Sequence, residues 1–349
     1  MREDVLHATS SNPAGSELSG KQTAISSALA SHSAGDKCFP ADLQVGSSAE
    51  KLLSCFLLLF FSVAATIFAA ASKAADGTYT YNTFMIPCSV EVSKFLVSTL
   101  ILLVNRVNGS GGDLVSFSLT RLGSYSLPAL CYFVSNNCMF FIIRDLGPTT
   151  FQIMNNLKII TTGAFMYVIL GKQLTWQRWK ALLILAAGCM VSQLQTCEAS
   201  AESHNFLRGY FWVSINALVA GVGGVLSEKL LKGEKGNKES IHWQNMQLYF
   251  FGILFGLASL MRADINVSRG VYHGFNAAAY ATIASLSTCG LLVSFILKYL
   301  DNIAKCFVNA LSIVFVAIIQ AAGDRTWIST QIAIGLALTS IALEQYNAE

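Results

Sequence analysis

Residues 52–72 read LLSCFLLLFFSVAATIFAAAS, a run that contains no charged side chain. A helix that crosses the hydrocarbon core of a bilayer needs about 20 mostly apolar residues, so this run is predicted to span a membrane. The run begins near Lys51, after a polar tail. A cleaved signal peptide begins near the first residue and has an apolar core of only about 7–15 residues. The run is therefore interpreted as a retained first helix.

The same pattern recurs along the rest of the chain. Further apolar runs of spanning length lie near residues 84–104, 122–143, 148–170, 177–195, 208–231, 243–261, 275–297, 303–321 and 327–346. Of 349 residues, 53% are hydrophobic and 12% are charged, whereas about 25% are charged in a typical soluble domain. We therefore predict an all-α polytopic membrane protein of about ten transmembrane helices. Only residues 144–147 separate the third run from the fourth, which predicts a tight hairpin there.

The ends and the cysteines add little chemistry. Residues 1–50 are rich in Ser, Ala and Gly without an apolar period, so they are predicted to be a disordered cytosolic tail before a ten-helix domain at 51–346. Seven of the nine cysteines lie in apolar runs and none forms a CxxC pair, so they are interpreted as small packing residues. The net charge of +3 gives little support for nucleic-acid binding.

Loop charges predict the orientation. The even-numbered loops and the adjoining helix ends carry eleven Lys and Arg side chains, and the odd-numbered ones carry six. Because cytosolic loops are enriched in Lys and Arg, the even loops and both termini are predicted to be cytosolic. Asn266-Val267-Ser268 is a glycosylation sequon in the seventh loop, which this orientation makes lumenal.

The chain shows signs of an internal repeat. Thr175-Trp176 opens the fifth run and Thr326-Trp327 opens the tenth, and aligning these pairs places Lys158 opposite Asn309. Two halves of five helices each, about 51–196 and 207–346, must have opposite orientations because five is odd. The fold is therefore predicted to be two inverted five-helix repeats, an arrangement that places a substrate site between the halves.

Charged side chains inside the runs are the first candidates for function. Lys158 lies about ten residues into the fourth run, roughly 15 Å from its end and near the bilayer centre. A charge there costs at least about 2.5–3.5 kcal/mol, so it needs an anionic ligand, an internal ion pair or water. Lys305 lies near the cytosolic end of the ninth run, where a lysine can also reach the headgroups. Glu91 and Lys94 are one turn apart and form either an ion pair, a gate or part of a ligand site.

Uncharged polar side chains inside the runs are the second set. Tyr132, Ser135, Asn136 and Asn137 lie in the third run, and Asn245, Gln247 and Tyr249 in the seventh. Such groups either bond between helices or line a wet cavity. The sequence has no HExxH, no GxxxxGK[ST] and no GxSxG motif. We therefore predict no metal site, no cofactor, no ATP-driven pump and no enzyme.

Residues 156–162 (NLKIITT) make a family resemblance visible. The chain resembles the nucleotide-sugar transporters of the drug/metabolite transporter superfamily, in the branch that includes UDP-galactose, UDP-N-acetylglucosamine and CMP-sialic acid carriers. The other segments that carry the resemblance run in family order over about residues 50–346: EVSK (91–94), YFVSNN (132–137), GKQLTWQRW (171–179), EKLLK (228–232), NMQLY (245–249) and DNIAK (301–305).

The resemblance implies ten helices in two inverted repeats and an antiporter that exchanges a nucleotide sugar for a nucleoside monophosphate. It implies that Lys158 and Lys305 engage the phosphates. It also implies a nucleotide and sugar pocket made by Tyr132, Asn136, Asn137, Asn245 and Ser294. Two positions depart from the pattern of many animal members: Phe151 stands for a frequent tyrosine, and Asn155-Asn156 stand for Tyr-Gln. These positions are added to the expected pocket, and they make a substrate copied from animal relatives unsafe.

The expected function is an antiporter that moves a cytosolic UDP-sugar, either an N-acetylhexosamine or galactose, into the Golgi lumen in exchange for UMP. The endoplasmic reticulum is the alternative membrane, and a homodimer is an open alternative to a monomer. A CMP-sialic acid/CMP antiporter and a general metabolite exporter are the alternative functions. A membrane-embedded glycosyltransferase is disfavoured because Asp264, Asp301 and Asp324 lie in separate loops and form no acidic cluster.

Overall fold

The ten apolar runs correspond to helices in the computed structural model, which describes residues 48–74, 79–108, 117–194, 206–233, 239–261, 272–323 and 329–348. The predicted tail falls outside this part of the chain up to residue 47. The helices all belong to one unit, Gly46–Glu349. They are α2 (Ser48–Ala71), α3 (Met85–Val107), α4 (Leu119–Met154), α5 (Lys158–Leu170), α6 (Trp176–Ser192), α7 (Phe206–Lys232), α8 (Ile241–Leu260), α9 (Ala277–Tyr299), α10 (Asn302–Gly323) and α11 (Thr330–Asn347).

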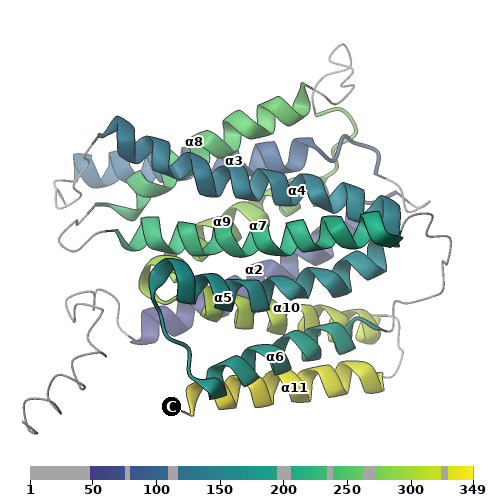
Figure 1. Ribbon diagram of the computed structural model, residues 1–349. Helices are drawn as coiled ribbons and strands as arrows, with labels where there is room; N and C mark the ends of the chain where they lie inside the picture. The colour runs from purple at the N-terminus through teal and green to yellow at the C-terminus, as the bar shows by residue number, and fades with distance from the viewer. Residues whose placement is uncertain are drawn as a thin grey trace, which may run out of the picture. The chain divides into compact units, whose positions relative to one another are not determined.

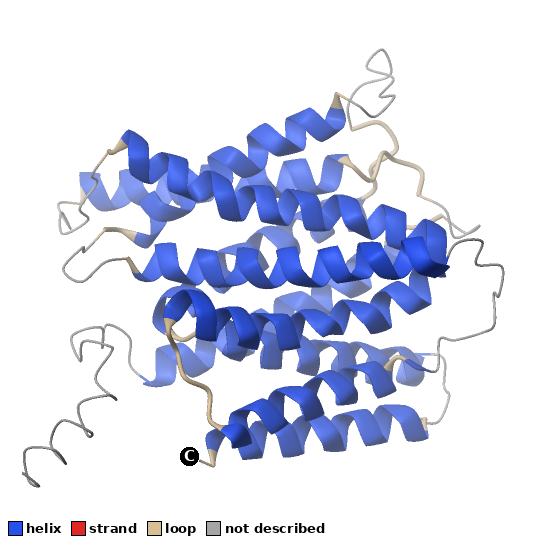
Figure 2. Ribbon diagram, in the orientation of Figure 1, coloured by secondary structure: helices blue, strands red, loops and turns tan. Residues whose placement is uncertain are grey.

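The prediction of an all-α polytopic membrane protein is confirmed. No strand occurs among the described residues (Figure 2). Seven segments are long and apolar enough by themselves to cross a membrane. The helix α6 has 17 residues and so spans about 26 Å, close to the roughly 30 Å of the hydrocarbon core. The chain therefore folds as a bundle of membrane-spanning helices.

The hairpin between the third and fourth runs is present inside α4. Gly147 has φ 82° and ψ 162°, which interrupts the helix, and the two spans on either side are Leu119–Gly147 and Thr150–Leu170. Glycine suits this turn because it has no Cβ to oppose a positive φ. The carboxylate of Asp145 accepts bonds from Arg208 Nε and Nη2 at 2.8 and 2.7 Å. This ion pair fixes the hairpin to the start of α7.

Several helix ends follow from local sequence. The side-chain oxygens of Thr175, Asn276 and Ser329 accept the backbone N–H of the residue three positions later, which caps the starts of α6, α9 and α11. Gly171 ends α5 in the left-handed conformation, with φ 64°. The tenth helix therefore begins at Thr330, and Thr326-Trp327 lie outside the described residues.

The packing of the helices pairs the two halves of the chain. The most extensive contacts join α4 to α7, α2 to α9, α6 to α11 and α3 to α8 (Figure 1). The other major contacts also occur in matching pairs when each helix is replaced by its counterpart in the other half (α2 by α7, α3 by α8, α4 by α9, α5 by α10). The contact of α5 with α7 matches that of α10 with α2, and the contact of α4 with α8 matches that of α9 with α3. Two repeats of five helices would produce this exchange.

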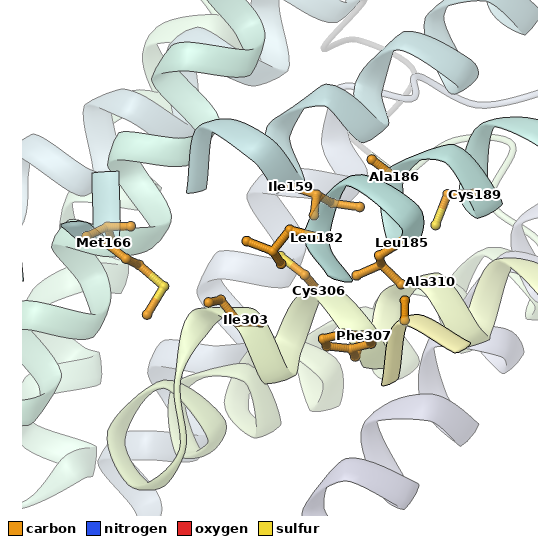
Figure 3. Close-up of a cluster of buried hydrophobic side chains, with 12 residues drawn as sticks. Ile159, Met166, Leu182, Leu185, Ala186, Cys189, Ile303, Cys306, Phe307 and Ala310 are labelled. Atoms are coloured by element: carbon orange, nitrogen blue, oxygen red, sulfur yellow. The ribbon is translucent and has the colours of Figure 1, made fainter. Parts of the chain in front are cut away.

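A buried apolar cluster holds α5, α6, α7, α10 and α11 together. Figure 3 shows Ile159 of α5, Leu182 and Leu185 of α6, and Ile303 and Phe307 of α10 in this cluster. Burying a leucine or isoleucine side chain contributes about 1.5–3 kcal/mol each. Lys158 directly precedes Ile159 in the sequence, and Lys305 lies between Ile303 and Phe307. The cluster therefore fixes the helix segments from which these lysines project.

Candidate functional site

Two cavities lie between the helices. The first, called the aromatic cavity, has a volume of about 830 Å³, and its lining includes Tyr79, Tyr81, Tyr132, Tyr249, Phe84 and Phe140. The second, called the amide cavity, has a volume of about 630 Å³, and its lining includes Gln152, Asn155, Asn156, Gln193, Asn309 and Gln320. The two cavities share the lining residues Tyr132, Asn136, Lys305 and Asn309. A ligand with two different halves could therefore extend from one cavity into the other.

Lys158 and Lys305 stand in the walls of these cavities. Lys158 is the first residue of α5, directly after the 3₁₀ turn Asn155–Leu157, and it lines the amide cavity. Lys305 lies in the first turn of α10 and lines both cavities. Among the described residues, neither ammonium group has a carboxylate within ion-pair distance. An internal ion pair thus does not account for Lys158 in this part of the chain, and the arrangement suits an anion.

Tyr132 and Asn136 lie one turn apart on α4 and line both cavities. The hydroxyl of Tyr132 is 3.2 Å from Ser227 Oγ. Asn137 lines the aromatic cavity but donates its amide N–H to Phe133 O at 2.8 Å. The third run therefore both lines the cavities and bonds to α7, so its two interpretations do not exclude each other.

Glu91 and Lys94 form an ion pair of 2.6 Å in the wall of the aromatic cavity. The ammonium of Lys94 also lies 4.3 Å from the centre of the Tyr249 ring. Glycines make room for the pair, because a Cβ on Gly252 would lie 2.7 Å from Glu91 Oε2 and a Cβ on Gly290 would collide with the Lys94 side chain. Unlike Lys158 and Lys305, Lys94 is therefore neutralised by its own helix.

Ser294 is buried on α9 and lines the aromatic cavity, with its hydroxyl 3.1 Å from the Tyr249 hydroxyl. Two other expected pocket residues line neither cavity. Phe151 packs in an apolar cluster with Ile142, Leu146 and Val213, and Asn245 is only 2% exposed. The sequon at Asn266 lies outside the described residues.

Sequence reasoning missed some polar residues near the cavities. Ser227 of α7 and Gln152 and Gln320 of the amide cavity were not expected to contribute. Asn216 was also missed; it is 3% exposed on α7 and touches both Ser135 and Asn155. Each of them is a polar side chain inside an apolar run, which is the signal that could have found them.

One end of the bundle is closed. The basic end, defined by the loops α3–α4, α5–α6, α7–α8 and α9–α10, contains two ion pairs between the halves of the chain. Lys172 binds Asp301 at 2.8 Å, and Arg121 binds Glu239. Burial alone would raise the pKa of the Asp301 carboxyl, but the charge and hydrogen bond of Lys172 outweigh this and hold that pKa below its usual value.

A second set of bonds adds to this closure. Glu228, which is fully buried, accepts from Lys232 Nζ at 2.6 Å and from the backbone N–H of Asn302 at 2.8 Å. Lys232 also donates to the carbonyl of Leu300 at 2.6 Å. No described residue of the loops at the basic end lines either cavity, whereas Tyr79, Tyr81, Thr83 and Phe84 of the α2–α3 loop line the aromatic cavity. As far as the described residues show, the cavities thus do not reach the basic end.

A helical membrane protein with a polar, cationic cavity between its two halves, sealed at one end by ion pairs between them, has the architecture of a carrier. The family model described as nucleotide-sugar transporter matches residues 47–347, and this chain therefore belongs to the nucleotide-sugar transporter family. The family consists of multi-pass transporters of nucleotide sugars and not of enzymes.

Individual relatives differ in their names. CMP-sialic acid transporter 1 of Arabidopsis thaliana is 30% identical, over 78% of this chain and 83% of that protein. CMP-sialic acid transporter 1 of Oryza sativa subsp. japonica is 28% identical, over 78% and 86%. The UDP-galactose translocator of Mus musculus is 35% identical, over 54% of this chain and 49% of that protein. A crystal structure covering 86% of this chain superposes with a TM-score of 0.65 at 13% identity, which shows the fold alone.

Proposed function

We propose that this chain is an antiporter that carries a cytosolic UDP-sugar, either an N-acetylhexosamine or galactose, into the Golgi lumen in exchange for UMP. The observation that carries the proposal is the pair Lys158 and Lys305, which line the cavities without a carboxylate partner among the described residues. A diphosphate carries about two negative charges. Two ammonium groups replace the hydration that such a group loses, through charge-assisted hydrogen bonds.

The remaining cavity residues suit the uncharged parts of the substrate. Asn136 and Asn155 offer amide groups near Lys158, while Asn137 and Ser294 lie in the aromatic cavity, beyond Lys305. Tyrosine rings can stack on a base or a sugar ring, and Tyr132 lines both cavities. Phe151 and Asn245 are proposed to support the pocket through packing only.

The proposed carrier domain covers residues 51–346, with inverted repeats at about 51–196 and 207–346. The exchange of packing partners between the halves supports this division. The larger number of Lys and Arg side chains at the basic end supports a cytosolic position for that end and for both termini. In this orientation the closed end faces the cytosol and the aromatic cavity reaches toward the lumen.

The charges also favour strict exchange. When the cavity is empty, two like charges remain in a site that must be enclosed during the transition, and enclosing unpaired charge is costly. A bound anion removes this penalty, so the loaded carrier turns over faster than the empty one. Measurable uniport by the purified protein would contradict this argument.

A second candidate is a CMP-sialic acid/CMP antiporter, which is favoured by the names of the Arabidopsis and rice relatives. The decisive experiment uses purified protein in liposomes preloaded with UMP, CMP or GMP. Uptake of labelled UDP-sugars, CMP-sialic acid and GDP-mannose is measured for each preload. We expect UDP-sugar uptake to be stimulated by internal UMP. Uptake of CMP-sialic acid stimulated only by CMP would establish the second candidate, and no dependence on any preload would exclude an antiporter.

A further inference from the structure

Three polar side chains from three segments form a chain of hydrogen bonds that ends at the amide cavity. The hydroxyl of Ser135 on α4 donates to Asn216 Oδ1 on α7 at 2.6 Å. Asn216 Nδ2 donates to Asn155 Oδ1 at 3.4 Å. Asn155 begins the 3₁₀ turn before Lys158 and lines the amide cavity. We call Ser135, Asn216 and Asn155 the amide relay.

The relay gives Asn155 a fixed polarity. A hydroxyl that donates to Asn216 Oδ1 leaves the Nδ2 of Asn216 for Asn155, because the two ends of an amide differ in kind. Asn155 then accepts with Oδ1, and its N–H groups are left for the cavity. Among the described residues, Asn155 Nδ2 has no hydrogen-bond partner. Asn155 therefore presents a hydrogen-bond donor to whatever fills the amide cavity.

The middle of the relay is held rigidly. Asn216 is 3% exposed. The next residue, Ala217, accepts a bond from Thr161 Oγ1 of α5 at 2.6 Å. One turn on, Gly221 allows close packing, since a Cβ there would lie 2.7 Å from the same Thr161 oxygen. The orientation of Asn155 is thus imposed by the packing of α4, α5 and α7.

Neighbouring amides lack this fixed donor. Asn156 Nδ2 donates to the carbonyls of Gln152 and Ile153, at 3.1 and 3.2 Å. The side chain of Gln152 is exposed and has no bond to another described residue, so it can present either of its ends. Of these three amides, only Asn155 is oriented by a second side chain.

A fixed donor discriminates only against a ligand group whose polarity is also fixed. Phosphate oxygens always accept and are served by the lysines, and sugar hydroxyls both donate and accept. A nucleobase edge is different, because at position 4 of the ring uracil carries a carbonyl oxygen, which accepts, where cytosine carries an amino group, which donates. A buried donor facing an amino group leaves both groups unpaired, and such sites discriminate strongly.

We propose that Asn216 is a positioning residue that holds the N–H of Asn155 toward position 4 of a pyrimidine base, so that the site favours uracil over cytosine. This inference rests on the proposed nucleotide-sugar exchange. It assigns the choice of base to a relay between helices and not to the lysines.

The test compares UMP with CMP as internal exchange substrates in liposomes, for the wild type and for Asn216→Leu, Asn216→Asp and Ser135→Ala. Ser214→Ala is the matched control, because Ser214 lies on the same helix, is exposed and bonds only to the carbonyl of Tyr210 among the described residues. The readout is the ratio of half-saturating concentrations for CMP and UMP. Defects of folding or expression act on both nucleotides equally and cancel in this ratio.

We expect the wild type and Ser214→Ala to prefer UMP, and Asn216→Leu and Ser135→Ala to reduce the preference by about tenfold, as expected for the loss of one buried hydrogen bond. In Asn216→Asp both carboxylate oxygens accept, so Asn155 must turn its N–H inward and present its oxygen. The preference should then move toward CMP. The added charge does not confound this, because UMP and CMP have identical phosphates.

An unchanged ratio in all three relay variants would overturn the inference, whether the two half-saturating concentrations stay the same or rise equally. Where a variant expresses too poorly for transport, the dissociation constants of UMP and CMP are measured from thermal stabilisation in detergent. Their ratio then replaces the transport ratio. A wild type that exchanges no nucleotide at all would contradict the proposed function itself, so the two failures are distinguishable.

Discussion

At the scale of single residues, the site depends on charge that is left unpaired. Lys94, Lys172 and Lys232 each bind a carboxylate, whereas Lys158 and Lys305 bind none among the described residues. An unpaired ammonium inside a membrane protein is unfavourable unless a ligand supplies the counter-charge. The three paired lysines are therefore assigned a structural role, and the two others carry the proposed function.

Lys158→Ala should reduce nucleotide exchange by at least about tenfold, since hydrogen bonds to charged groups contribute about 1.5–3 kcal/mol. Lys158→Arg should retain little activity, because a planar guanidinium does not replace a compact ammonium. Counter-transport in liposomes measures both. Lys180→Ala is the control, since Lys180 is exposed on α6. Exchange by Lys158→Ala at the wild-type rate would remove the phosphate role.

The sequence predicted this site in part. Lys158, Tyr132 and Asn136 could be found because a polar group in an apolar run is conspicuous, and all three line a cavity. Phe151 and Asn245 were expected in the pocket but line neither cavity. The direction in which a helical side chain points depends on packing against other helices, and one sequence does not contain it. The pairing of Lys172 with Asp301, far apart in the chain, was invisible for the same reason.

At the scale of helices, small residues set the distances. Gly221 of α7 lies against Thr161 of α5, and Gly224 lies against the amide of Asn302, 2.5 Å from a Cβ placed there. Apolar runs predicted the helices well because length and hydropathy decide them. Close approaches between helices cannot be assigned in this way, since a glycine in a span is compatible with tight packing but does not name its partner.

Gly221→Ala should therefore destabilise the protein by about 1–3 kcal/mol, because the new methyl group meets both the side chain and the backbone of Thr161. Gly123→Ala in α4 is the matched control, because nothing lies within 4 Å of its added Cβ. The midpoint of thermal unfolding in detergent measures both variants. Equal midpoints would show that α5 and α7 can separate freely.

The basic end should open when its ion pairs are broken. Asp301→Asn removes the partner of Lys172 and should increase the reaction of Cys306, which lines the amide cavity, with an impermeant maleimide added at the basic end. The measurement uses a background in which the other cysteines are replaced. The charge-swapped double variant Lys172→Asp/Asp301→Lys should restore protection. Equal labelling in all variants would show that the pair does not seal this end.

The same pair predicts a pH dependence. A carboxyl whose pKa is lowered in the folded protein stabilises the fold fully above its ordinary pKa of about 4, and that contribution disappears only as the pH falls through the lowered value. Between pH 5.5 and 8, labelling of Cys306 in the wild type, divided by the labelling of a free thiol at the same pH, should therefore be constant. A rise in labelling between pH 7 and 5.5 would mean that another group controls the seal.

At the scale of the whole molecule, the two halves are expected to move against each other around the lysines. The orientation remains a prediction from loop charge. Epitope tags at both termini should be accessible in sealed microsomes without detergent, whereas a tag in a lumenal loop should not. Protection of either terminal tag would contradict the proposed orientation and reverse the direction of transport.

The closure by ion pairs has a consequence for the balance between the two forms of the carrier. An apolar plug would expose oily surface whenever it opened, and water would drive it shut again. Charged groups that part in water become hydrated, and the side chains of Lys172 and Asp301, which are 25% and 19% exposed, are already partly hydrated, so separating them costs less than separating a fully buried pair. The closed and open forms of this end thus differ little in free energy. A binding free energy of a few kilocalories per mole is enough to shift the balance between them in either direction.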